Sequence, residues 1–422
     1  VEVDSGGRAV RTLSRTPPVS GNNLVLNLDA KLQEIAYNAF GERRGALVAI
    51  DPTTGGVLAF VSKPGFDPNL FVDGIDPQSW GELNGSIDKP LLNRAAAGTY
   101  PPGSTFKPFM SLAALNTGKR SASQIIYDPG FFMFGNHRFR DDKESGHGSV
   151  DMYKSIVQSC DTYYYMLARD MGVDLIYEQM KLLGFGQLTG IDIQGESRGI
   201  LPSTEWKQNT YKRAEQQRWY SGETISLGIG QGYNSFTMLQ LAQAVATLAN
   251  NGMRNRPHLV REVVDIETKE KQVVVKDPPQ SLGFRPEDLE LIRKAMIGVN
   301  LEGTSAGSFV AAEYTSAGKT GTAQVFTIKQ NEKYEAGKID ERLRDHALFI
   351  AFAPAENPKV ALAMVVENGG FGAQSAAPMA RRVFDYLFLG LYPSLEDMDA
   401  VRIGLATRPL GKRRPAASVP WP

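Results

Sequence analysis

Strand-like apolar segments lie towards both ends of this sequence, and a long helical stretch separates them. The segments 45–50 and 56–61 are joined by a turn that contains Pro52 and Gly55, which is the pattern of a β-hairpin. The last third of the chain returns to similar apolar runs, whereas residues from about 103 to 300 are mainly of helical periodicity. Because the terminal strands most simply bury their faces in one sheet, we expect a mainly antiparallel sheet, a helical lobe and a cleft between them.

The predicted fold class is α/β, in its α+β form, with a five-stranded sheet flanked by helices and the lobe inserted between its two segments. The strands are expected at 45–50, 56–61, 315–325, 346–352 and 359–367. One flanking helix would be capped by Asp29 and end at Phe40, and the other would span 375–389. Lobe helices are expected at 105–115, 153–171, 175–183, 237–250 and 286–299.

Charge and composition exclude some classes of protein. The 422 residues include 46 Lys and Arg against 46 Asp and Glu. No excess of cations is available to displace counterions from a nucleic acid, so no nucleic-acid partner is expected. Cys160 is the single cysteine, so no intrachain disulfide can form. The sequence has no run of about 18 apolar residues, which a membrane-spanning helix would need.

A serine followed three residues later by a lysine stands where a helix would begin. The Pro-Pro-Gly segment 101–103 stops any preceding element, so Ser104 would lie at a helix N-terminus with Lys107 on the same face. A serine hydroxyl is a poor nucleophile without a neighbouring base, and a lysine can be that base if its pKa is depressed. The same string occurs at 86–89 and 316–319, but neither segment offers a helix face.

Two further motifs follow in chain order. The Ser-Cys-Asp segment 159–161 lies in a helical region, and the Lys-Thr-Gly-Thr segment 319–322 lies in an expected strand. Gly321 in an edge strand would let a substrate backbone approach closely, and the hydroxyls of Thr320 and Thr322 would help to bind a carboxylate. The order Ser-x-x-Lys, Ser-x-Asn-like, Lys-Thr-Gly is the signature set of penicillin-recognising proteins, in which the serine is acylated.

With these motifs the chain resembles the transpeptidase domain of a class B penicillin-binding protein, in the elongation-type penicillin-binding protein 2 branch. The resemblance covers nearly all of the chain. The matching segments are Gly45-Ala-Leu-Val-Ala-Ile-Asp-Pro52, Phe66-Asp-Pro-Asn-Leu-Phe71, Pro101-Pro-Gly-Ser-Thr-Phe-Lys-Pro108, Ser226-Leu-Gly-Ile-Gly-Gln-Gly232 and Ala317-Gly-Lys-Thr-Gly-Thr-Ala-Gln324. It implies the penicillin-binding and serine β-lactamase-like transpeptidase fold, and a peptidoglycan D,D-transpeptidase that β-lactams acylate.

The resemblance also implies a role for each motif residue. Ser104 would attack the penultimate D-alanine carbonyl of a peptidoglycan stem peptide and release terminal D-alanine, with Lys107 as its base. Ser159 would relay protons to and from the amines, and Lys319 would keep that network polarised. The backbone N–H groups of Ser104 and Thr322 would hold the oxyanion. An amine of a neighbouring stem would then resolve the acyl-enzyme into a cross-link during cell elongation, and this chemistry requires no cofactor.

Asp161 departs from the family pattern, in which the third residue of the middle motif is usually Asn. An amide can donate a hydrogen bond to a substrate carbonyl, whereas an ionised carboxylate cannot. Asp161 would instead pair with Lys107 or Lys319 and raise the pKa of that lysine. The penicillin-binding protein 2 branch often has Asp at this position, so the expected activity is unchanged.

Four side chains ahead of and inside the middle motif form a candidate metal site: Asp128, Asp141, His147 and Cys160. A thiol, an imidazole and two carboxylates suit a four-coordinate zinc ion, which would clamp the loop beneath Ser159. Their long, irregular spacing is not that of a zinc finger, so the residues alone leave open that Cys160 fills a buried gap and His147 lies in a loop. Some proteins of the resembled branch have the same four residues and bind zinc there, which implies a structural zinc here.

The resemblance divides the chain into parts. Residues 1–22 would be the end of a non-catalytic pedestal, and 23–407 the transpeptidase domain. The basic, proline-bearing tail 408–422 is expected to be disordered, and the charged segment 326–345 to form a surface loop. The family's membrane anchor is absent from this chain, so the resemblance implies the periplasmic domain of a single-pass inner-membrane protein.

Expected partners follow from the same resemblance. They are peptidoglycan stem peptides, β-lactams, a glycan-polymerising membrane protein of the shape, elongation, division and sporulation (SEDS) family, and scaffold proteins of the rod-shape machinery. A D,D-carboxypeptidase or β-lactamase on the same scaffold is the main alternative, although the sequence offers no evident carboxylate to activate water. A non-catalytic β-lactam sensor is the other. The glycine-rich segment 228–232 lacks the spacing of a dinucleotide site and is expected to pack under the active site.

Overall fold

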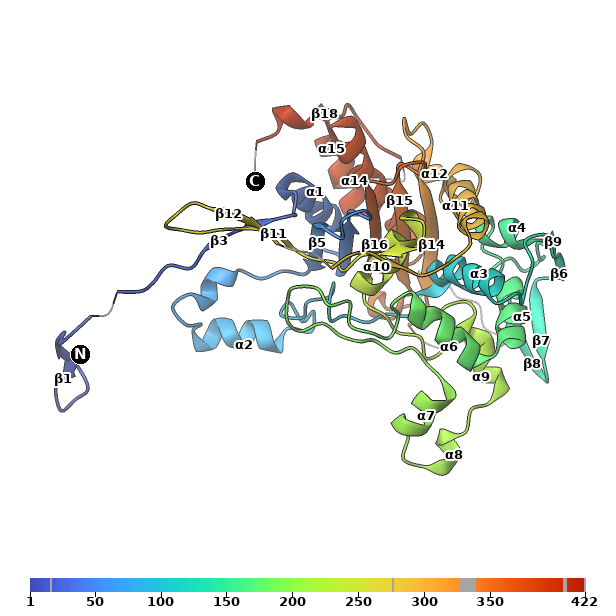
Figure 1. Ribbon diagram of the computed structural model, residues 1–422, viewed down its shortest axis with the longest axis horizontal. Helices are drawn as coiled ribbons and strands as arrows, with labels where there is room; N and C mark the ends of the chain where they lie inside the picture. The colour runs from blue at the N-terminus through green and yellow to red at the C-terminus, as the bar shows by residue number, and fades with distance from the viewer. Residues whose placement is uncertain (16, 275–276, 326–338, 405–407, 421–422) are drawn as a thin grey trace.

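The computed structural model describes the chain except for residues 16, 275–276, 326–338, 405–407 and 421–422. At its centre is a five-stranded antiparallel sheet in the order β14-β15-β16-β4-β5 (Figure 1). The strands are β4 (Gly45–Ile50), β5 (Val57–Lys63), β14 (Ala317–Ala323), β15 (His346–Ala353) and β16 (Val360–Val366). Strands from both ends of the chain therefore share one sheet, and the predicted α+β fold is confirmed.

Both faces of this sheet are covered, which explains why its strands are apolar without alternation. Ala46, Val48 and Ile50 of β4 pack into one hydrophobic cluster, whereas Leu47 and Ala49 pack into a second cluster on the opposite face. The second cluster is covered by α1 (Ala30–Phe40), α14 (Ala377–Leu389) and α15 (Leu395–Arg402), and the first by α3 (Lys107–Asn116), α10 (Met238–Ala249) and α11 (Pro286–Leu301).

One helix of the lobe is broken where the sequence predicts continuity. The segment expected as a helix over 153–171 forms α4 (Met152–Val157) and α5 (Asp161–Met171), and Ser159 between them has φ +60°. A residue in the left-handed region cannot continue a right-handed helix, so the single-helix prediction is wrong here. The break leaves residues 158–160 as a short connector that presents Ser159 between two helix ends.

The remainder of the lobe consists of short helices, among them the one predicted over 175–183, and two small sheets that the sequence did not predict. β6 pairs with β9, and β7 pairs with β8. These elements are β6 (Ile126–Asp128), β7 (Phe131–Phe134), β8 (His137–Arg140), β9 (Gly148–Val150), η2 (Gly103–Phe106), α6 (Val173–Leu182), α7 (Thr204–Thr210), α8 (Ala214–Gln217), α9 (Ser221–Leu227) and α12 (Ala306–Phe309).

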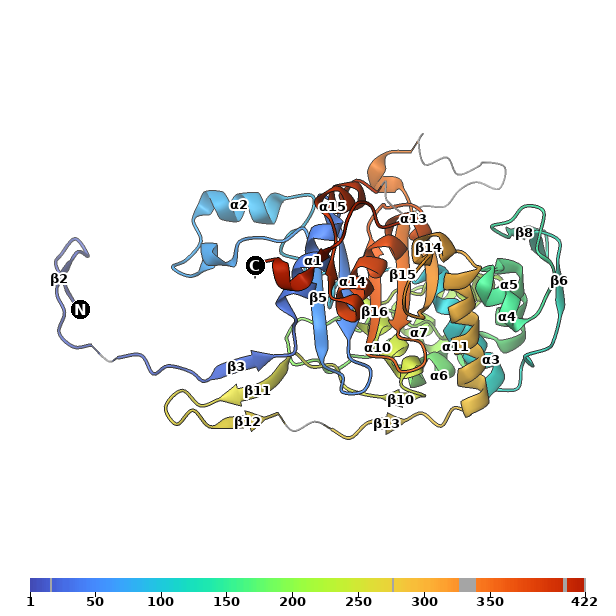
Figure 2. The same ribbon diagram turned by 90° about the horizontal axis from the view of Figure 1, so that it is seen from above.

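The N-terminal residues lie away from the main body. A small β1–β2 hairpin stands at the far end of an extended arm (Figure 2). The arm joins the body through β3, which forms a three-stranded sheet with β11 and β12. The peripheral elements are β1 (Glu2–Val3), β2 (Ala9–Arg11), β3 (Asn23–Leu26), η1 (Pro68–Phe71), α2 (Pro77–Gly85), β10 (Met253–Arg254), β11 (Val260–Val264), β12 (Lys271–Val273), β13 (Gln280–Ser281), η4 (Glu341–Leu343) and α13 (Gly372–Ser375).

The C-terminal tail is ordered over 408–420, which differs from the predicted disorder. β18 (Arg414–Pro415) pairs with β17 (Leu391–Tyr392), and η5 (Ala416–Ser418) follows. The ammonium of Lys31 donates hydrogen bonds of 2.7 Å to the carbonyls of Ala416 and Val419. Backbone groups of the tail thus find partners on the domain, which its composition does not reveal.

Two other expectations concern the charged surface loop and a membrane-spanning helix. Most of the charged surface loop predicted over 326–345 lies outside them, since residues 326–338 are not described. Among the helices of the described chain, none combines the length and the apolar character that a bilayer crossing requires.

Candidate active site

The nucleophile candidate Ser104 lies in η2, a single tight turn that runs directly into α3. Gly103 begins the turn with φ +53°, and its N–H donates to the carbonyl of Gly230 over 3.0 Å. A Cβ at Gly103 would lie 2.5 Å from the Thr322 carbonyl oxygen. Only glycine therefore allows the turn to approach β14 this closely, and that approach places Ser104 beside the Lys-Thr-Gly-Thr strand.

Lys107 is fully buried one turn after Ser104. Its Nζ donates to Asp161 Oδ1 (2.6 Å), to the Ser159 carbonyl (2.7 Å) and to Ser159 Oγ (3.1 Å). Within the described residues, the Ser104 hydroxyl makes no hydrogen bond to this ammonium. Lys107 follows Ser104 by one turn of the chain, and catalytic hydrogen bonds often tighten only when substrate is bound.

Ser159 is the point at which the two lysines meet. Its Oγ accepts hydrogen bonds from Lys107 Nζ (3.1 Å) and from Lys319 Nζ (2.9 Å). A hydroxyl has two acceptor lone pairs and one proton to donate. Because both lone pairs receive ammonium groups, the remaining O–H of Ser159 is left to donate to a group outside this network.

Lys319 reaches Ser159 from β14, the edge strand of the sheet, and its side chain is fully buried. Its Nζ also donates to the carbonyl of Thr320 (3.1 Å). Burial holds the pKa of Lys319 well below its usual value, and the nearby positive charge of Lys107 lowers it further. The network therefore contains a lysine whose charged form is disfavoured.

Asp161 is the first residue of α5 and forms an ion pair with Lys107. Of the two partners that the sequence allowed for Asp161, Lys107 and Lys319, the structure therefore shows Lys107. Burial raises the pKa of Asp161, and the Lys107 ammonium opposes that rise. We call Lys107, Ser159, Asp161 and Lys319 the lysine cluster. Its two lysine side chains outnumber its one carboxylate.

The end of β14 faces the turn that holds Ser104. The Thr322 carbonyl accepts a hydrogen bond from Gln231 Nε2 (3.2 Å), which does not belong to the sheet. In an antiparallel strand the N–H and C=O of one residue point to the same edge. The Thr322 N–H therefore points away from β15 as well, towards the segments that flank Ser104 and Gly103.

Two contacts at this edge of β14 were not predicted from the sequence. Gln231 was treated only as part of a glycine-rich packing segment, and the Gly230 carbonyl in that segment anchors the nucleophile turn. Thr304 Oγ1 lies 2.7 Å from Thr320 Oγ1, so the substrate-binding hydroxyl predicted at Thr320 is held by a residue beyond α11. No rule of sequence spacing links these residues. A polar side chain between two glycines, as at Gln231, could have indicated a contact with the active site.

The four predicted metal-ligating side chains come together beneath the same connector. Ligand atoms of Asp128, Asp141, His147 and Cys160 all lie within 4.8 Å of one another. His147 Nδ1 is 2.8 Å from Asp128 Oδ2 and 3.3 Å from Asp141 Oδ1, and both carboxylates are completely buried. Burial raises the pKa of the Cys160 thiol, and the negative charge of Asp141 adds to that rise. We call these four residues the acidic cluster.

The donor set of the acidic cluster fits a zinc ion. Thiolate, imidazole and carboxylate are zinc ligands, and four of them at this separation match a closed tetrahedral site. Further hydrogen bonds fix two ligands: Gly130 N–H donates to Asp128 Oδ1 (2.7 Å), and Thr162 N–H donates to Asp141 Oδ2 (2.8 Å). Two buried carboxylates beside a thiol are costly without a cation to neutralise them.

The fold and this geometry are those of a serine acyl-transferring domain of the penicillin-recognising class. A family model described as penicillin binding protein transpeptidase domain matches residues 45–385. The chain therefore belongs to the penicillin-binding protein transpeptidase family. The predicted resemblance to its penicillin-binding protein 2 branch is confirmed by similarities to individual relatives and solved structures.

The chain is 46% identical to the peptidoglycan D,D-transpeptidase MrdA of Acinetobacter baumannii, over 92% of this chain and 57% of that protein. The crystal structure of Pseudomonas aeruginosa PBP2 in complex with WCK 5153 is similar with a TM-score of 0.78 and 43% identity, covering 88% of this chain and 80% of that one. The complex of PBP2 and MreC from Helicobacter pylori is similar with a TM-score of 0.77 and 32% identity, covering 92% and 68%. The chain thus spans little more than half the length of the Acinetobacter relative.

Proposed function

We propose that this chain is the catalytic domain of a peptidoglycan D,D-transpeptidase that acts during cell elongation. The observation that carries the proposal is the shared hydroxyl of Ser159, which accepts hydrogen bonds from both Lys107 and Lys319 beside the turn that holds Ser104. This arrangement supplies a nucleophile, a lysine base and a proton-donating hydroxyl on three separate elements. The similarity to proteins named peptidoglycan D,D-transpeptidase supports the same reaction.

In the first half-reaction, Lys107 acts as its neutral amine after its proton has moved to Asp161, with which it shares a hydrogen bond. Ser104 Oγ attacks the carbonyl carbon of the penultimate D-alanine, and the serine proton passes to the Lys107 amine. The backbone N–H groups of Ser104 and Thr322 stabilise the oxyanion. The C–N bond then breaks, and the Ser159 hydroxyl donates its proton to the departing D-alanine nitrogen while Lys107 returns the proton to the network. Thr320, Gly321 and Thr322 hold the substrate backbone and the carboxylate of the leaving residue.

In the second half-reaction, a primary amine of a neighbouring stem peptide attacks the acyl-enzyme. A new C–N bond forms, the ester bond to Ser104 Oγ breaks, and the proton lost by the amine returns to Ser104. A β-lactam would form the same ester but leave no free position for the amine, so it would stay attached. The chain needs no metal or organic cofactor for these steps.

Mass spectrometry of the intact protein after exposure to penicillin tests this proposal. One adduct is expected, and peptide mapping should place it on Ser104. Ser104→Ala should abolish it, while Ser86→Ala, which removes the serine of another Ser-x-x-Lys string, should leave it intact. An adduct on a different side chain would contradict the assignment.

The two alternatives differ in the fate of the acyl-enzyme. A carboxypeptidase or β-lactamase would hydrolyse the adduct rapidly, so a long-lived penicillin adduct favours the transpeptidase. A non-catalytic sensor would also keep the adduct but would not cross-link stem peptides. Cross-linking by the wild type and its loss in Ser104→Ala would separate the enzyme from the sensor.

We also propose that the acidic cluster binds a structural zinc ion. Asp128, Asp141, His147 and Cys160 would hold it, and its charge would stabilise the connector that carries Ser159. Zinc analysis of protein purified without added metal should give about one zinc per chain. Cys160→Ser should lower this content, and equal, negligible zinc in both proteins would contradict the site.

The wider setting is proposed from the resemblance. Residues 1–22 would be the end of a pedestal and 23–407 the transpeptidase domain, held in the periplasm by an inner-membrane anchor outside this chain. Partners would include a SEDS-family polymerase and rod-shape scaffold proteins. The similar Helicobacter pylori protein, whose complex contains MreC, supports the scaffold partner.

A further inference from the structure

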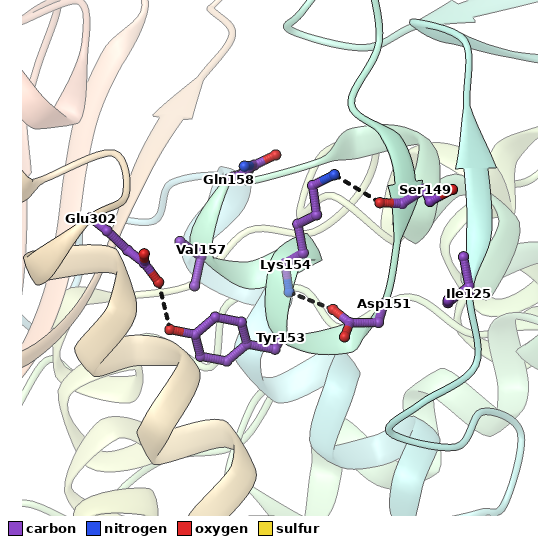
Figure 3. Close-up of a pocket in the computed structure, with 8 residues that line it drawn as sticks. All are labelled: Ile125, Ser149, Asp151, Tyr153, Lys154, Val157, Gln158 and Glu302. Carbon is purple, nitrogen blue, oxygen red and sulfur yellow. Dashed lines mark hydrogen bonds between the residues drawn. The ribbon is translucent and has the colours of Figure 1, made fainter.

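A surface pocket of about 370 Å³ is lined in part by Gln158, the residue before Ser159 of the lysine cluster, and the reaction described above gives it no role. Its walls come from α4, from the C-terminal end of α11, and from Ile125 and Ser149 at β6 and β9 (Figure 3). Tyr153 and Lys154 of α4 face it from one side, with Gln158 at its rim, and Glu302 faces it from the other. The pocket is therefore lined by the ends of two helices that lead into the active site and by residues at β6 and β9.

The two helical walls, from α4 and α11, continue directly into segments of the active site. Gln158 immediately precedes Ser159. Glu302 stands two residues before Thr304, whose Oγ1 is 2.7 Å from Thr320 Oγ1. A Cβ on Gly303 would lie 2.5 Å from the Val157 carbonyl oxygen, so the two walls touch through their backbones. The pocket thus adjoins the active site on the side of Ser159 and Thr320.

The charges in the pocket favour a cation. Lys154 Nζ donates to the carbonyls of His147 and Ser149, at 2.7 Å each, so its donors are directed at backbone oxygens. Glu302 is exposed, and one of its oxygens accepts a hydrogen bond from the Tyr153 hydroxyl (2.8 Å). With Asp151, which caps α4, the pocket presents two carboxylates and one ammonium. Such a surface raises the local concentration of cations.

The chemistry of the second half-reaction determines the side from which the acceptor must come. Attack of an amine on the acyl-enzyme is the reverse of D-alanine departure with a different amine. The new amine therefore approaches along the path by which D-alanine leaves. That path lies on the side of Thr320, which is proposed to hold the D-alanine carboxylate, and the pocket adjoins that side.

We propose that this pocket receives the acceptor stem peptide, with Glu302 binding the primary ammonium group before the amine moves to the acyl carbonyl. The inference rests on the proposed transpeptidase function and adds the acceptor position to it. The bound form is the ammonium ion. The ammonium passes one proton to solvent when it leaves Glu302, and the neutral amine gives up a second proton, through the lysine cluster to Ser104, when it attacks.

The experiment uses protein already acylated by penicillin, so that the donor position is filled. Binding of a stem peptide with a free side-chain amine is measured by calorimetry or NMR titration, with the same peptide N-acetylated at that amine for comparison. Glu302→Gln should weaken binding of the free-amine peptide about tenfold, the effect of one charge-assisted hydrogen bond, and should hardly change binding of the acetylated peptide. The weakening should shrink at high salt.

Glu287→Gln is the matched control, because Glu287 is an exposed residue at the opposite end of the same helix. Thermal unfolding of both variants checks that they are folded. Equal affinity of wild type and Glu302→Gln for the free-amine peptide, or no binding to the acylated wild type, would overturn the pocket assignment. Failure of penicillin to acylate Ser104 would instead overturn the proposed function.

Discussion

The lysine cluster and the acidic cluster lie on either side of one connector but have opposite charge balances. Ser159 of that connector receives two ammonium groups in the lysine cluster. Its neighbour Cys160 belongs to the acidic cluster, in which two buried carboxylates surround one imidazole. One short segment therefore separates a site with more basic than acidic side chains from a site with more acidic than basic side chains.

The difference shows how burial can serve two purposes. In the lysine cluster, burial and a second cation lower the pKa of Lys319, which favours the release of a proton and suits a catalytic base network. In the acidic cluster, the same burial raises the pKa of the Cys160 thiol, and the proposed zinc ion would favour its thiolate form. The first cluster should control the reaction rate, and the second should control stability.

Removal of one cation from the lysine cluster should have the largest effect. Lys319→Met should lower the second-order rate of acylation by penicillin about 1,000-fold, because general acid–base groups contribute roughly 10²–10⁴. The rate is followed with labelled penicillin in a time course. Lys294→Met, on the exposed side of α11, should keep the wild-type rate. A Lys319→Met rate within about threefold of wild type would show that the cluster does not control acylation.

Removal of metal from the acidic cluster should act on stability instead. A chelator should lower the melting temperature by about 4 °C, since a ligand at a thousand times its Kd contributes about 4 kcal/mol and a protein of this size loses about 1 °C per kcal/mol. Differential scanning calorimetry with and without chelator measures the shift. Cys160→Ser should melt at the lower temperature in both conditions, and an unchanged melting temperature of the wild type would contradict the metal.

Asp345, a buried carboxylate outside both clusters, gives a pH test of the same reasoning. Burial raises its pKa to about 6. The folded state then holds a proton that the unfolded state has lost, so this contribution to stability is complete below about pH 4 and disappears as pH rises through about 6. The loss amounts to about 2–3 kcal/mol, from roughly two pKa units.

The measurement is urea unfolding at several pH values. Asp345→Asn should flatten the pH dependence between about 4 and 6 relative to wild type. Asp340→Asn is the control, because Asp340 is exposed in the same segment. Identical pH profiles for wild type and Asp345→Asn would contradict the role assigned to burial.

The smallest effect is expected at the contact that aligns β14 with the nucleophile turn. Gln231→Ala removes the hydrogen bond to the Thr322 carbonyl and should slow acylation about three- to tenfold, the value of one neutral hydrogen bond. The same labelled-penicillin assay applies. Gln216→Ala on the surface of α8 should have no effect on the acylation rate. Equal rates for the two variants would show that Gln231 does not help to align β14 with the turn that holds Ser104.

The parts of the site that sequence could predict are those encoded by short patterns. The position of Ser104 one turn before Lys107 follows from their i, i+3 spacing at a proline- and glycine-bounded helix start. The strand that carries Lys319 follows from its apolar neighbours, and the sheet places it at an edge as expected. Each inference needed only residues close together in the chain.

The remaining features depend on contacts between distant segments or on one unusual backbone angle. Ser159 has a left-handed φ that helical periodicity does not reveal, since non-glycine residues rarely adopt it. The choice of Lys107 as the partner of Asp161, and the contact of Gln231 with Thr322, arise only when α3, α5 and β14 pack together. The ordered tail depends likewise on the Lys31 side chain, which comes from the opposite end of the chain.

A double-mutant cycle on the acylation rate tests the central claim, which is that Ser159 and Lys319 act as one unit. Ser159→Ala, Lys319→Met and the double variant are compared with wild type in the labelled-penicillin assay. If the lysine acts through the shared hydroxyl, the double variant should be hardly slower than the slower single variant. Rate losses that multiply would contradict the account, because the two side chains would then contribute independently.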